Sequence, residues 1–521
     1  MTVLDAVRYG DRGVLVWLPD QPSVLALLAE LTAHPVDGQV ELVPADGSLL
    51  VRCADAGAAL DALADISARR PPPPAPDATG RVDVDVVYDG PDLDEVARLV
   101  GCSVDEVATR HSGQDWTVAF TGFAPGFGYL VGDRGGLHVP RRETPRTSVA
   151  AGSVALGGNY SAIYPGPSPG GWQLIGRADA VLWDLRRDPP ALLRPGTRVR
   201  FRAVGTLPAP RPAASDGPYR FGEPDGSGLR IDRPGVLALV QDAGRSGLGG
   251  SGVPESGAAD LGAYEAANAA VGNAAGAAAL ELVLGAAAVT AVGDQWIAVT
   301  GAASDLRHLP VVGPPAAVPN GRALLLRDGD QLRVGRVTVG LRSYLAVRGG
   351  LSCPAVLGSR STDRLSGLGP PPVSAGMLLA VGQGSRDSID NRPDGRVVPA
   401  YSLETRRRLA VTAGPHLSRV RGDALADLSA REWQVTPASD RVGIRLAGAV
   451  LAGGGSTLPS APLVAGAVQL PPSGEPVVFL RDHPTTGGYP VIAVLTDAAI
   501  DAAAQLRPGD TVRFIQVGTA R

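Results

Sequence analysis

Residues 194–201 read RPGTRVRF, and residues 507–514 read RPGDTVRF. In both stretches the Pro-Gly pair predicts a tight turn, because Pro fixes one backbone angle and Gly tolerates a positive φ. The alternation of Val with polar residues after the turn predicts a strand with one buried face. The same turn and strand recur late in each half of the chain, which predicts related β-barrel units in both halves.

Stretches rich in Pro and polar residues divide the chain around these two units. Four consecutive prolines at 71–74 stop any helix and form a stiff spacer. Strand-like and helix-like runs alternate before it, and short strand-like runs dominate after it. The sequence therefore predicts a mainly β fold, with an α+β N-terminal domain followed by tandem β-barrels. The expected segments are an α+β domain at 1–70, a Pro-rich linker at 71–80, a barrel at 81–205, a linker at 206–228, and two further barrels at 229–395 and 396–521.

Composition and charge limit the classes of protein to which the chain can belong. Its formal net charge of −4 argues against nucleic-acid binding. The N-terminus has early acidic residues and no signal-peptide pattern, and no stretch is apolar enough to span a bilayer. Three widely spaced cysteines, Cys53, Cys102 and Cys353, predict no disulfide framework. We therefore expect a cytoplasmic protein that binds neither nucleic acid nor a membrane.

The sequence contains no lysine, so all 48 basic residues are arginines. A Walker A loop and a protein kinase site each need a lysine at the nucleotide phosphates. A pyridoxal-phosphate Schiff base and covalently attached biotin also need lysine. If a nucleotide binds, arginine side chains and backbone N–H groups must hold its phosphates.

Three motifs between residues 120 and 177 combine glycine and proline with aromatic residues. They are FTGFAPGFGY at 120–129, PRTSVAAGSVAL at 145–156 and IYPGPSPGGWQLIGR at 163–177. This set resembles the B-subunit family of 5-oxoprolinase, also called KipI or allophanate hydrolase subunit 1. The resemblance covers about residues 80–204 well and the first 70 residues loosely.

The second half carries four motifs in the order of a partner family. They are VQDAGRSGLGGSGVPESGAADLGAYEAAN at 240–268, YLAVRGGL…VLGSRSTD at 344–363, SDRVGIRL at 439–446 and HPTTGGYPVIAV at 483–494. They resemble the C-subunit family of 5-oxoprolinase, also called KipA or allophanate hydrolase subunit 2. The two resemblances imply cyclophilin-like β-barrels, one in the first half and two in the second. They also imply ATP-dependent opening of 5-oxoproline to L-glutamate, together with a separate A-subunit of the LamB/YcsF type.

This chemistry defines what the site must contain. A five-membered lactam is a poor electrophile, and phosphorylation of its amide oxygen would activate it toward water. We therefore expect ATP and Mg²⁺, a phosphate clamp and a pocket for a small carboxylate. The six histidines show no zinc-ligand spacing, so the residues that would bind a metal stay unassigned.

The polar residues of the motifs are the candidates for this site. The catalytic candidates are Asp440, Arg441, Asp482 and His483. The substrate- or nucleotide-binding candidates in the second half are Arg360, Asp363, Thr485, Thr486, Gly487, Gly488 and Tyr489. Those in the first half are Arg146, Tyr164, Ser168, Gln173 and Arg177. These residues could also have purely structural roles. TTGGYP could form a tight turn that enters a strand, and Arg360 and Asp363 could form a structural ion pair.

Two other functions also remain open. The paired domains resemble part of urea carboxylase, so the chain could act as a carboxyltransferase module on carboxybiotin carried by another protein. KipI- and KipA-like proteins are associated with regulation of a histidine kinase, which gives a binding function as the third hypothesis. The sequence does not decide whether the chain forms a homo-oligomer.

Overall fold

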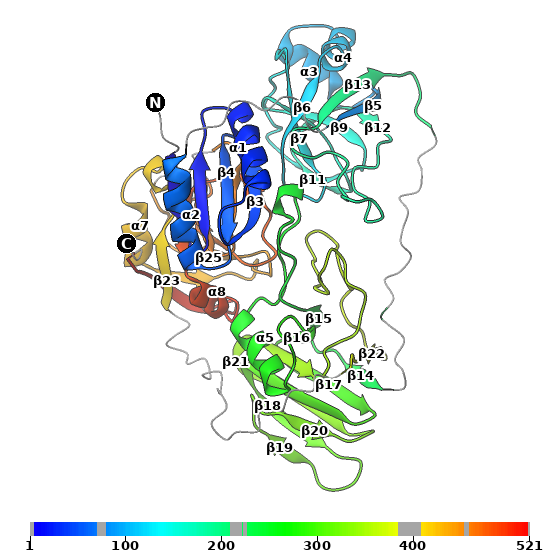
Figure 1. The fold of residues 1–521 in the computed structure, drawn as a ribbon, viewed down its shortest axis with the longest axis vertical. Helices are drawn as coiled ribbons and strands as arrows, with labels where there is room; N and C mark the ends of the chain where they lie inside the picture. The colour runs from blue at the N-terminus through cyan, green and yellow to red at the C-terminus, as the bar shows by residue number, and fades with distance from the viewer. Residues whose placement is uncertain are drawn as a thin grey trace.

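The computed structural model describes residues 5–69, 80–208, 221, 227–383, 408–452 and 458–518, which form four packed units (Figure 1). Most of the two expected linkers, 71–80 and 206–228, lies outside the described residues. None of the described helices is long and apolar enough to cross a membrane. The predicted mainly β fold with an α+β N-terminal unit is confirmed, and two of the units are closed seven-stranded barrels.

The N-terminal unit is a four-stranded antiparallel sheet, paired in the order β1-β2-β4-β3, with two helices on one face. Both helices begin after an aspartate, Asp20 or Asp55, whose side chain accepts a hydrogen bond from a backbone N–H of the first turn. The other face of the sheet presents Leu15 and Leu50 to Val494 of the last barrel. The elements are β1 (Asp5–Tyr9), β2 (Gly13–Trp17), α1 (Gln21–Ala33), β3 (Gln39–Ala45), β4 (Ser48–Cys53) and α2 (Ala56–Ala68).

The first barrel closes in the order β10-β7-β6-β13-β5-β12-β9. Two strands outside the ring, β8 and β11, pair with each other as a short arm. The elements are β5 (Arg81–Val87), α3 (Leu93–Val100), α4 (Val104–Ser112), β6 (Trp116–Thr121), β7 (Gly128–Gly132), β8 (Arg146–Val149), β9 (Ser153–Gly157), β10 (Tyr160–Ile163), β11 (Ser168–Gly170), β12 (Gln173–Ala178) and β13 (Arg198–Ala203).

The last barrel closes in the order β23-β30-β27-β28-β25-β24-β31, which is the same topology as the first. In each barrel the strand of the repeated Pro-Gly motif, β13 or β31, pairs in parallel with the first strand of the ring. The arm of this barrel is the pair β26–β29. The elements are β23 (Arg408–Ala413), η2 (Leu417–Arg419), α7 (Ala424–Ala430), β24 (Glu432–Val435), β25 (Gly443–Ala447), β26 (Ala461–Pro462), β27 (Ala467–Gln469), β28 (Val477–Phe479), β29 (Thr486–Gly487), β30 (Val491–Leu495), α8 (Asp497–Ala503) and β31 (Thr511–Gln516).

The middle unit differs from the barrel expected at 229–395. Strand pairing within residues 227–383 gives a branched nine-stranded sheet that does not close into a ring. The long strand β21 causes this, because one edge pairs with both β16 and β17 and the other with β18. The elements are β14 (Gly228–Arg233), β15 (Leu237–Gln241), η1 (Gly249–Ser251), α5 (Leu261–Ala270), β16 (Ala279–Val283), β17 (Gly285–Val292), β18 (Gln295–Leu309), β19 (Ala316–Val318), β20 (Leu324–Leu326), β21 (Gln331–Val347) and β22 (Leu378–Ala380).

One segment of the middle unit, residues 242–260, contacts all three other units, and we call it the junction segment. In Figure 1 it rises from α5 toward the first barrel. Its Glu255 is paired with Arg52 of the N-terminal unit at 2.7 Å. Its Ser251 carbonyl accepts a hydrogen bond from Gly126 N of the first barrel, and Ser256 donates to Asp482 of the last barrel. The two halves of the chain therefore form one packed body.

Candidate functional site

A buried ion cluster lies where the junction segment meets the last barrel. Arg441, in the loop between β24 and β25, donates from Nε and Nη2 to the two oxygens of Asp482 at 2.9 and 3.1 Å. Its Nη1 donates to Glu281 of β16 and its Nη2 also donates to the Gly257 carbonyl. All three nitrogens of this guanidinium are therefore used, and the predicted candidates Arg441 and Asp482 do lie together.

The same cluster keeps its charges although it is buried. Burial alone would raise the pKa of the Glu281 carboxyl, but Arg441 and Arg342 hold it below its ordinary value. Burial opposes the charge of Arg441, yet Asp482 and Glu281 raise its pKa well above the usual range. Tyr344 Oη and Ala259 N also donate to Glu281. Glu281 and Arg441 are therefore ionised, and their ion pair joins the middle unit to the last barrel.

Next to this cluster, Arg245 and Asp363 form an incomplete buried pair. Arg245 Nη1 lies 3.9 Å from Asp363 Oδ2, beyond hydrogen-bond distance, and both side chains are fully buried. Arg245 Nε and Nη1 and Asp363 Oδ2 have no hydrogen-bond partner among the described residues. Burial lowers the pKa of Arg245 and raises the pKa of Asp363. Perturbed, incompletely paired charges of this kind are typical of functional sites.

Ser256 connects the two groups of charges. Its Oγ donates to Asp482 Oδ1 at 2.8 Å and lies 3.5 Å from the Thr362 carbonyl, in the loop that carries Asp363. Arg245, in the same junction segment, donates to the Ser361 carbonyl at 2.6 Å. The junction segment thus holds Ser256 and Arg245 between the two loops.

Three other candidates of the second half are engaged elsewhere. Asp440 accepts the backbone N–H groups of Val442 and Gly443 in its own turn. Arg360 donates from Nε to the Cys353 carbonyl rather than to Asp363. His483 is buried, its Nδ1 lies 2.8 Å from the Pro484 carbonyl, and burial lowers its pKa. A neutral imidazole in this position does not supply a positive charge to a phosphate.

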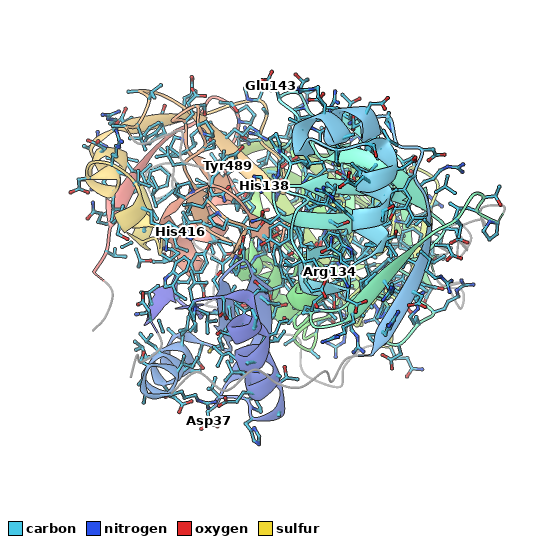
Figure 2. The ribbon with its side chains drawn as sticks, turned by 90° about the horizontal axis from the view of Figure 1, so that it is seen from above. Asp37, Arg134, His138, Glu143, His416 and Tyr489 are labelled. Atoms are coloured by element: carbon cyan, nitrogen blue, oxygen red, sulfur yellow. The ribbon has the colours of Figure 1, made fainter. Side chains whose placement is uncertain are left out.

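The TTGGYP stretch forms strand β29 and the contact between the two barrels. Thr486 and Gly487 pair with β26, and the carbonyls of Thr485 and Gly488 accept backbone hydrogen bonds from that side. A Cβ at Gly122 of the first barrel would lie 2.1 Å from Thr486 Oγ1, so only glycine fits there. The labelled Tyr489 and His138 lie along the line where the barrels meet in Figure 2.

The first barrel gathers the other predicted group at its arm. Arg146 of β8 and Arg142 donate to the same oxygen of Asp92, at 2.7 and 2.8 Å. Asp92 Oδ2 accepts the backbone N–H of Leu174 at 2.7 Å. Gln173 is buried and donates to the Pro140 carbonyl. The arm therefore brings Arg146 and Gln173 together with two residues that the motifs did not single out, Asp92 and Arg142.

The remaining candidates of the first half lie at the arm or outside it. Ser168 of β11 pairs with Val149 across the arm. Tyr164 is buried against Phe127 at a ring distance of 5.3 Å, and burial raises its pKa to about 12. Arg177 is exposed and pairs with Asp89, so it lies on the outer surface.

Sequence reasoning missed Glu281 and Asp92, which each complete a charged cluster. Glu281 was detectable as a lone carboxylate in the apolar strand ALELV, since a buried charge needs a partner. Asp92 follows Gly-Pro in a loop and gave no comparable indication. Glu281 and Asp92 both lie far in the sequence from the arginines with which they pair.

Both halves of the chain match known protein families. The family model "Carboxyltransferase domain, subdomain C and D" matches residues 4–193, and "Carboxyltransferase domain, subdomain A and B" matches residues 251–516. The chain is 36 % identical to the 5-oxoprolinase C-subunit of Escherichia coli K12 over 292 residues, which are 55 % of this chain and 91 % of that protein. It is 49 % identical to the 5-oxoprolinase B-subunit of Escherichia coli O157:H7 over 123 residues, 23 % of this chain and 56 % of that protein.

The crystal structure of TTHA0988 matches almost the whole chain. The TM-score is 0.84 at 33 % sequence identity, with 97 % of this chain and 99 % of that chain covered. Residues 4–70, part of the N-terminal stretch that resembled the B-subunit only loosely, fall within the matched family region. The chain belongs to the carboxyltransferase-domain family, with a part similar to the B-subunit of 5-oxoprolinase fused ahead of a part similar to its C-subunit.

Proposed function

We propose that the chain is the fused B and C component of an ATP-dependent 5-oxoprolinase. It would open 5-oxoproline to L-glutamate together with an A-subunit of the LamB/YcsF type. The supporting observation is that parts similar to the B- and C-subunits lie in one chain. The junction segment packs them together through its contacts with Arg52 and Asp482. A fusion of this kind is expected when two subunits act as one body.

The proposed reaction transfers the γ-phosphate of ATP to the lactam oxygen. One water then adds to the ring carbon, and the ring C–N bond breaks as the nitrogen takes a proton, which leaves γ-glutamyl phosphate. A second water hydrolyses this acyl phosphate and releases the carboxylate and phosphate. The products are L-glutamate, ADP and phosphate, and two waters are consumed in the sum of both hydrolyses. Each step builds negative charge on oxygen, which fixed arginines can stabilise.

Arg245 and Asp363 are the residues of the second half best suited to this chemistry. Arg245 has buried N–H groups without partners, which could donate to an oxygen that gains charge. Burial raises the pKa of Asp363, so this carboxyl is more readily protonated than an exposed one and could give a proton to the ring nitrogen. Within the described ranges, no group of three or more His, Cys, Asp and Glu side chains is arranged for a metal ion, so no residue is assigned to Mg²⁺.

Reconstitution tests the proposal directly. The purified chain is mixed with a purified A-subunit of the LamB/YcsF type, and glutamate and ADP release are followed with 5-oxoproline and MgATP. We expect release only from the complete mixture, and a fall of at least about tenfold in kcat for Asp363→Asn, as for a lost proton donor. Absence of glutamate above background in a folded, complete mixture would refute the proposal.

The name of the matching family favours one second candidate, a carboxyltransferase module. It would accept a carboxyl group from carboxybiotin on another protein, because this chain has no lysine to carry biotin. To test this second function, a carboxybiotin carrier and urea are added in place of the LamB/YcsF protein and MgATP, and carboxyl transfer to urea is measured. Carboxyl transfer to urea without glutamate release would favour this second function.

A further inference from the structure

The arm of the first barrel carries more positive than negative charge. Arg142 and Arg146 share one oxygen of Asp92, so two guanidinium groups face one carboxylate. Arg141, the neighbour of Arg142, lies with its guanidinium carbon 5.7 Å from the ring centre of Trp172. Glu143 of the same loop is exposed and lies at the rim of the molecule in Figure 2. The arm is therefore left with a surplus of arginine.

Several polar atoms at this arm are buried but have no partner. Within the described ranges, no group forms a hydrogen bond with Arg142 Nε, Arg146 Nη1, Ser168 Oγ or Gln173 Oε1. An unmet buried polar atom costs about 1–3 kcal/mol, and more when it is charged, so four together indicate a missing partner. The side chains of Arg142 and Arg146 remain 36 % and 23 % exposed, so a small ligand can reach them from solvent.

The last barrel shows that the barrel fold does not require these arginines. Asp92 N donates to the Leu174 carbonyl and Asp92 Oδ2 accepts from Leu174 N. At the corresponding place in the last barrel, His416 N donates to the Val491 carbonyl and His416 Nδ1 accepts from Val491 N at 3.2 Å. A neutral acceptor thus satisfies the same backbone position. The two arginines in the first barrel are therefore not needed to satisfy this backbone position.

We infer that the arm of the first barrel is an oxyanion site, which takes a carboxylate or phosphate group between Arg142 and Arg146. The guanidinium N–H groups without partners would donate to the anion, because charge-assisted hydrogen bonds to arginine are short and strong. Ser168 can donate to the same group. Gln173 Oε1 can accept from a neighbouring N–H or O–H of the ligand. Under the proposed function, on which this identification rests, the anion is the carboxylate of 5-oxoproline or a phosphate of ATP.

Direct binding to the full chain separates these two sources. Isothermal titration is run with 5-oxoproline, with ATP and with inorganic phosphate, in a buffer free of other oxyanions. Binding of 5-oxoproline alone assigns the site to the carboxylate, and binding of ATP and phosphate assigns it to the phosphate. If no probe binds up to millimolar concentrations, the inference is overturned. These measurements need no turnover, so their result is independent of whether the chain is a 5-oxoprolinase.

Variants locate the binding. We expect Arg146→Gln to weaken the bound probe by roughly 10- to 100-fold, as for a lost charge-assisted hydrogen bond. Arg202→Gln is the matched control, because Arg202 is an exposed arginine of the same barrel, paired with Asp85 at 2.7 Å. Its affinity should equal that of the unmodified chain. If thermal unfolding shows that Arg146→Gln does not fold, Ser168→Ala replaces it, with an expected loss of about threefold or more. Unchanged affinity in a folded arm variant would overturn the inference.

Discussion

The two barrels share one topology but use arginine in opposite ways. In the last barrel, one guanidinium, Arg441, uses all its nitrogens on two buried carboxylates and a carbonyl. In the first barrel, two guanidiniums compete for one oxygen of Asp92 and keep unmet N–H groups. The charges around Arg441 in the last barrel are balanced and closed to solvent, which suits a joint between units. The charges around Asp92 in the first barrel are unbalanced and open to solvent, which suits the binding of a ligand.

The largest expected effect comes from Arg441→Met. This change leaves Glu281 and Asp482 buried without their cation, and breaking a buried ion pair on one side costs about 3–5 kcal/mol. The midpoint of urea unfolding should therefore fall strongly. Arg513→Met in the same barrel is the control, since Arg513 is half exposed, and it should change little.

The outcome also separates structure from catalysis. Adding Glu281→Gln and Asp482→Asn to Arg441→Met should restore part of the lost stability, because three buried charges disappear together while buried Arg342 loses its carboxylate. A variant Arg441→Met that unfolds like the unmodified chain but has lost turnover would contradict the structural role and make Arg441 a catalytic residue.

A second effect concerns pH. His416 is buried, and burial together with Arg419 lowers its pKa to about 4. The unfolded chain takes up this proton near pH 6.5 and the folded chain only near pH 4, so the stability present above pH 6.5 is lost as the pH falls toward 4. The loss is up to about 3 kcal/mol from this group.

His416→Asn keeps an acceptor for Val491 N but cannot take the proton. Its stability should therefore fall less steeply between pH 6.5 and 4, as measured by urea unfolding at several pH values. His138→Asn changes an exposed histidine of the first barrel and should keep the slope of the unmodified chain. An unaltered slope in His416→Asn would show that other groups cause the acid sensitivity. Burial also lowers the pKa of His111, to about 3, so part of the slope should remain.

A third, smaller effect is expected for Asp92→Asn. Asp92 accepts hydrogen bonds from two arginines and a backbone N–H. Burial alone would raise the pKa of this carboxyl, but these contacts hold it below its ordinary value. Loss of the charge should reduce the free energy of unfolding by about 2 kcal/mol, less than for Arg441→Met, because the arginines can turn to solvent. Anion affinity at the arm should be kept or increased, since a negative charge has been removed. Loss of all binding in a folded Asp92→Asn variant would contradict this.

Much of the fold could be predicted from local sequence. The repeated Pro-Gly turn and strand anticipated two related barrels, and both motif strands occupy the same place in their rings. The middle sheet could not be predicted in this way. Its shape depends on β21, whose pairing with β18 shifts register at three places, and such shifts arise from tertiary contacts rather than from periodicity.

The site was only partly predictable for a related reason. Arg441 and Asp482 are 41 residues apart but both lay in or beside quoted motifs, so they could be selected together. Glu281 lies 160 residues from Arg441 in another unit, and no spacing rule connects them. Whether a guanidinium is fully used or left with unmet N–H groups depends on such distant partners. The distinction between the two barrels therefore needed the three-dimensional arrangement.

The smallest effect is expected for Arg177→Gln, because the geometry of strand β12 places Arg177 on the outer surface. Alternation along β12 would place Gln173 and Arg177 on the same face, which favours an anion contact for both. The pairing with β9 shifts register between Leu174 and Gly176, so the strand turns Arg177 outward. There it pairs with Asp89 while 60 % exposed, an arrangement that contributes at most about 1 kcal/mol. Arg177→Gln should therefore leave both glutamate release and anion affinity unchanged, whereas Arg146→Gln should not. Equal losses of affinity in the two variants would mean that the anion is held by the general charge of the barrel, and the contrast between its arm and its surface would fail.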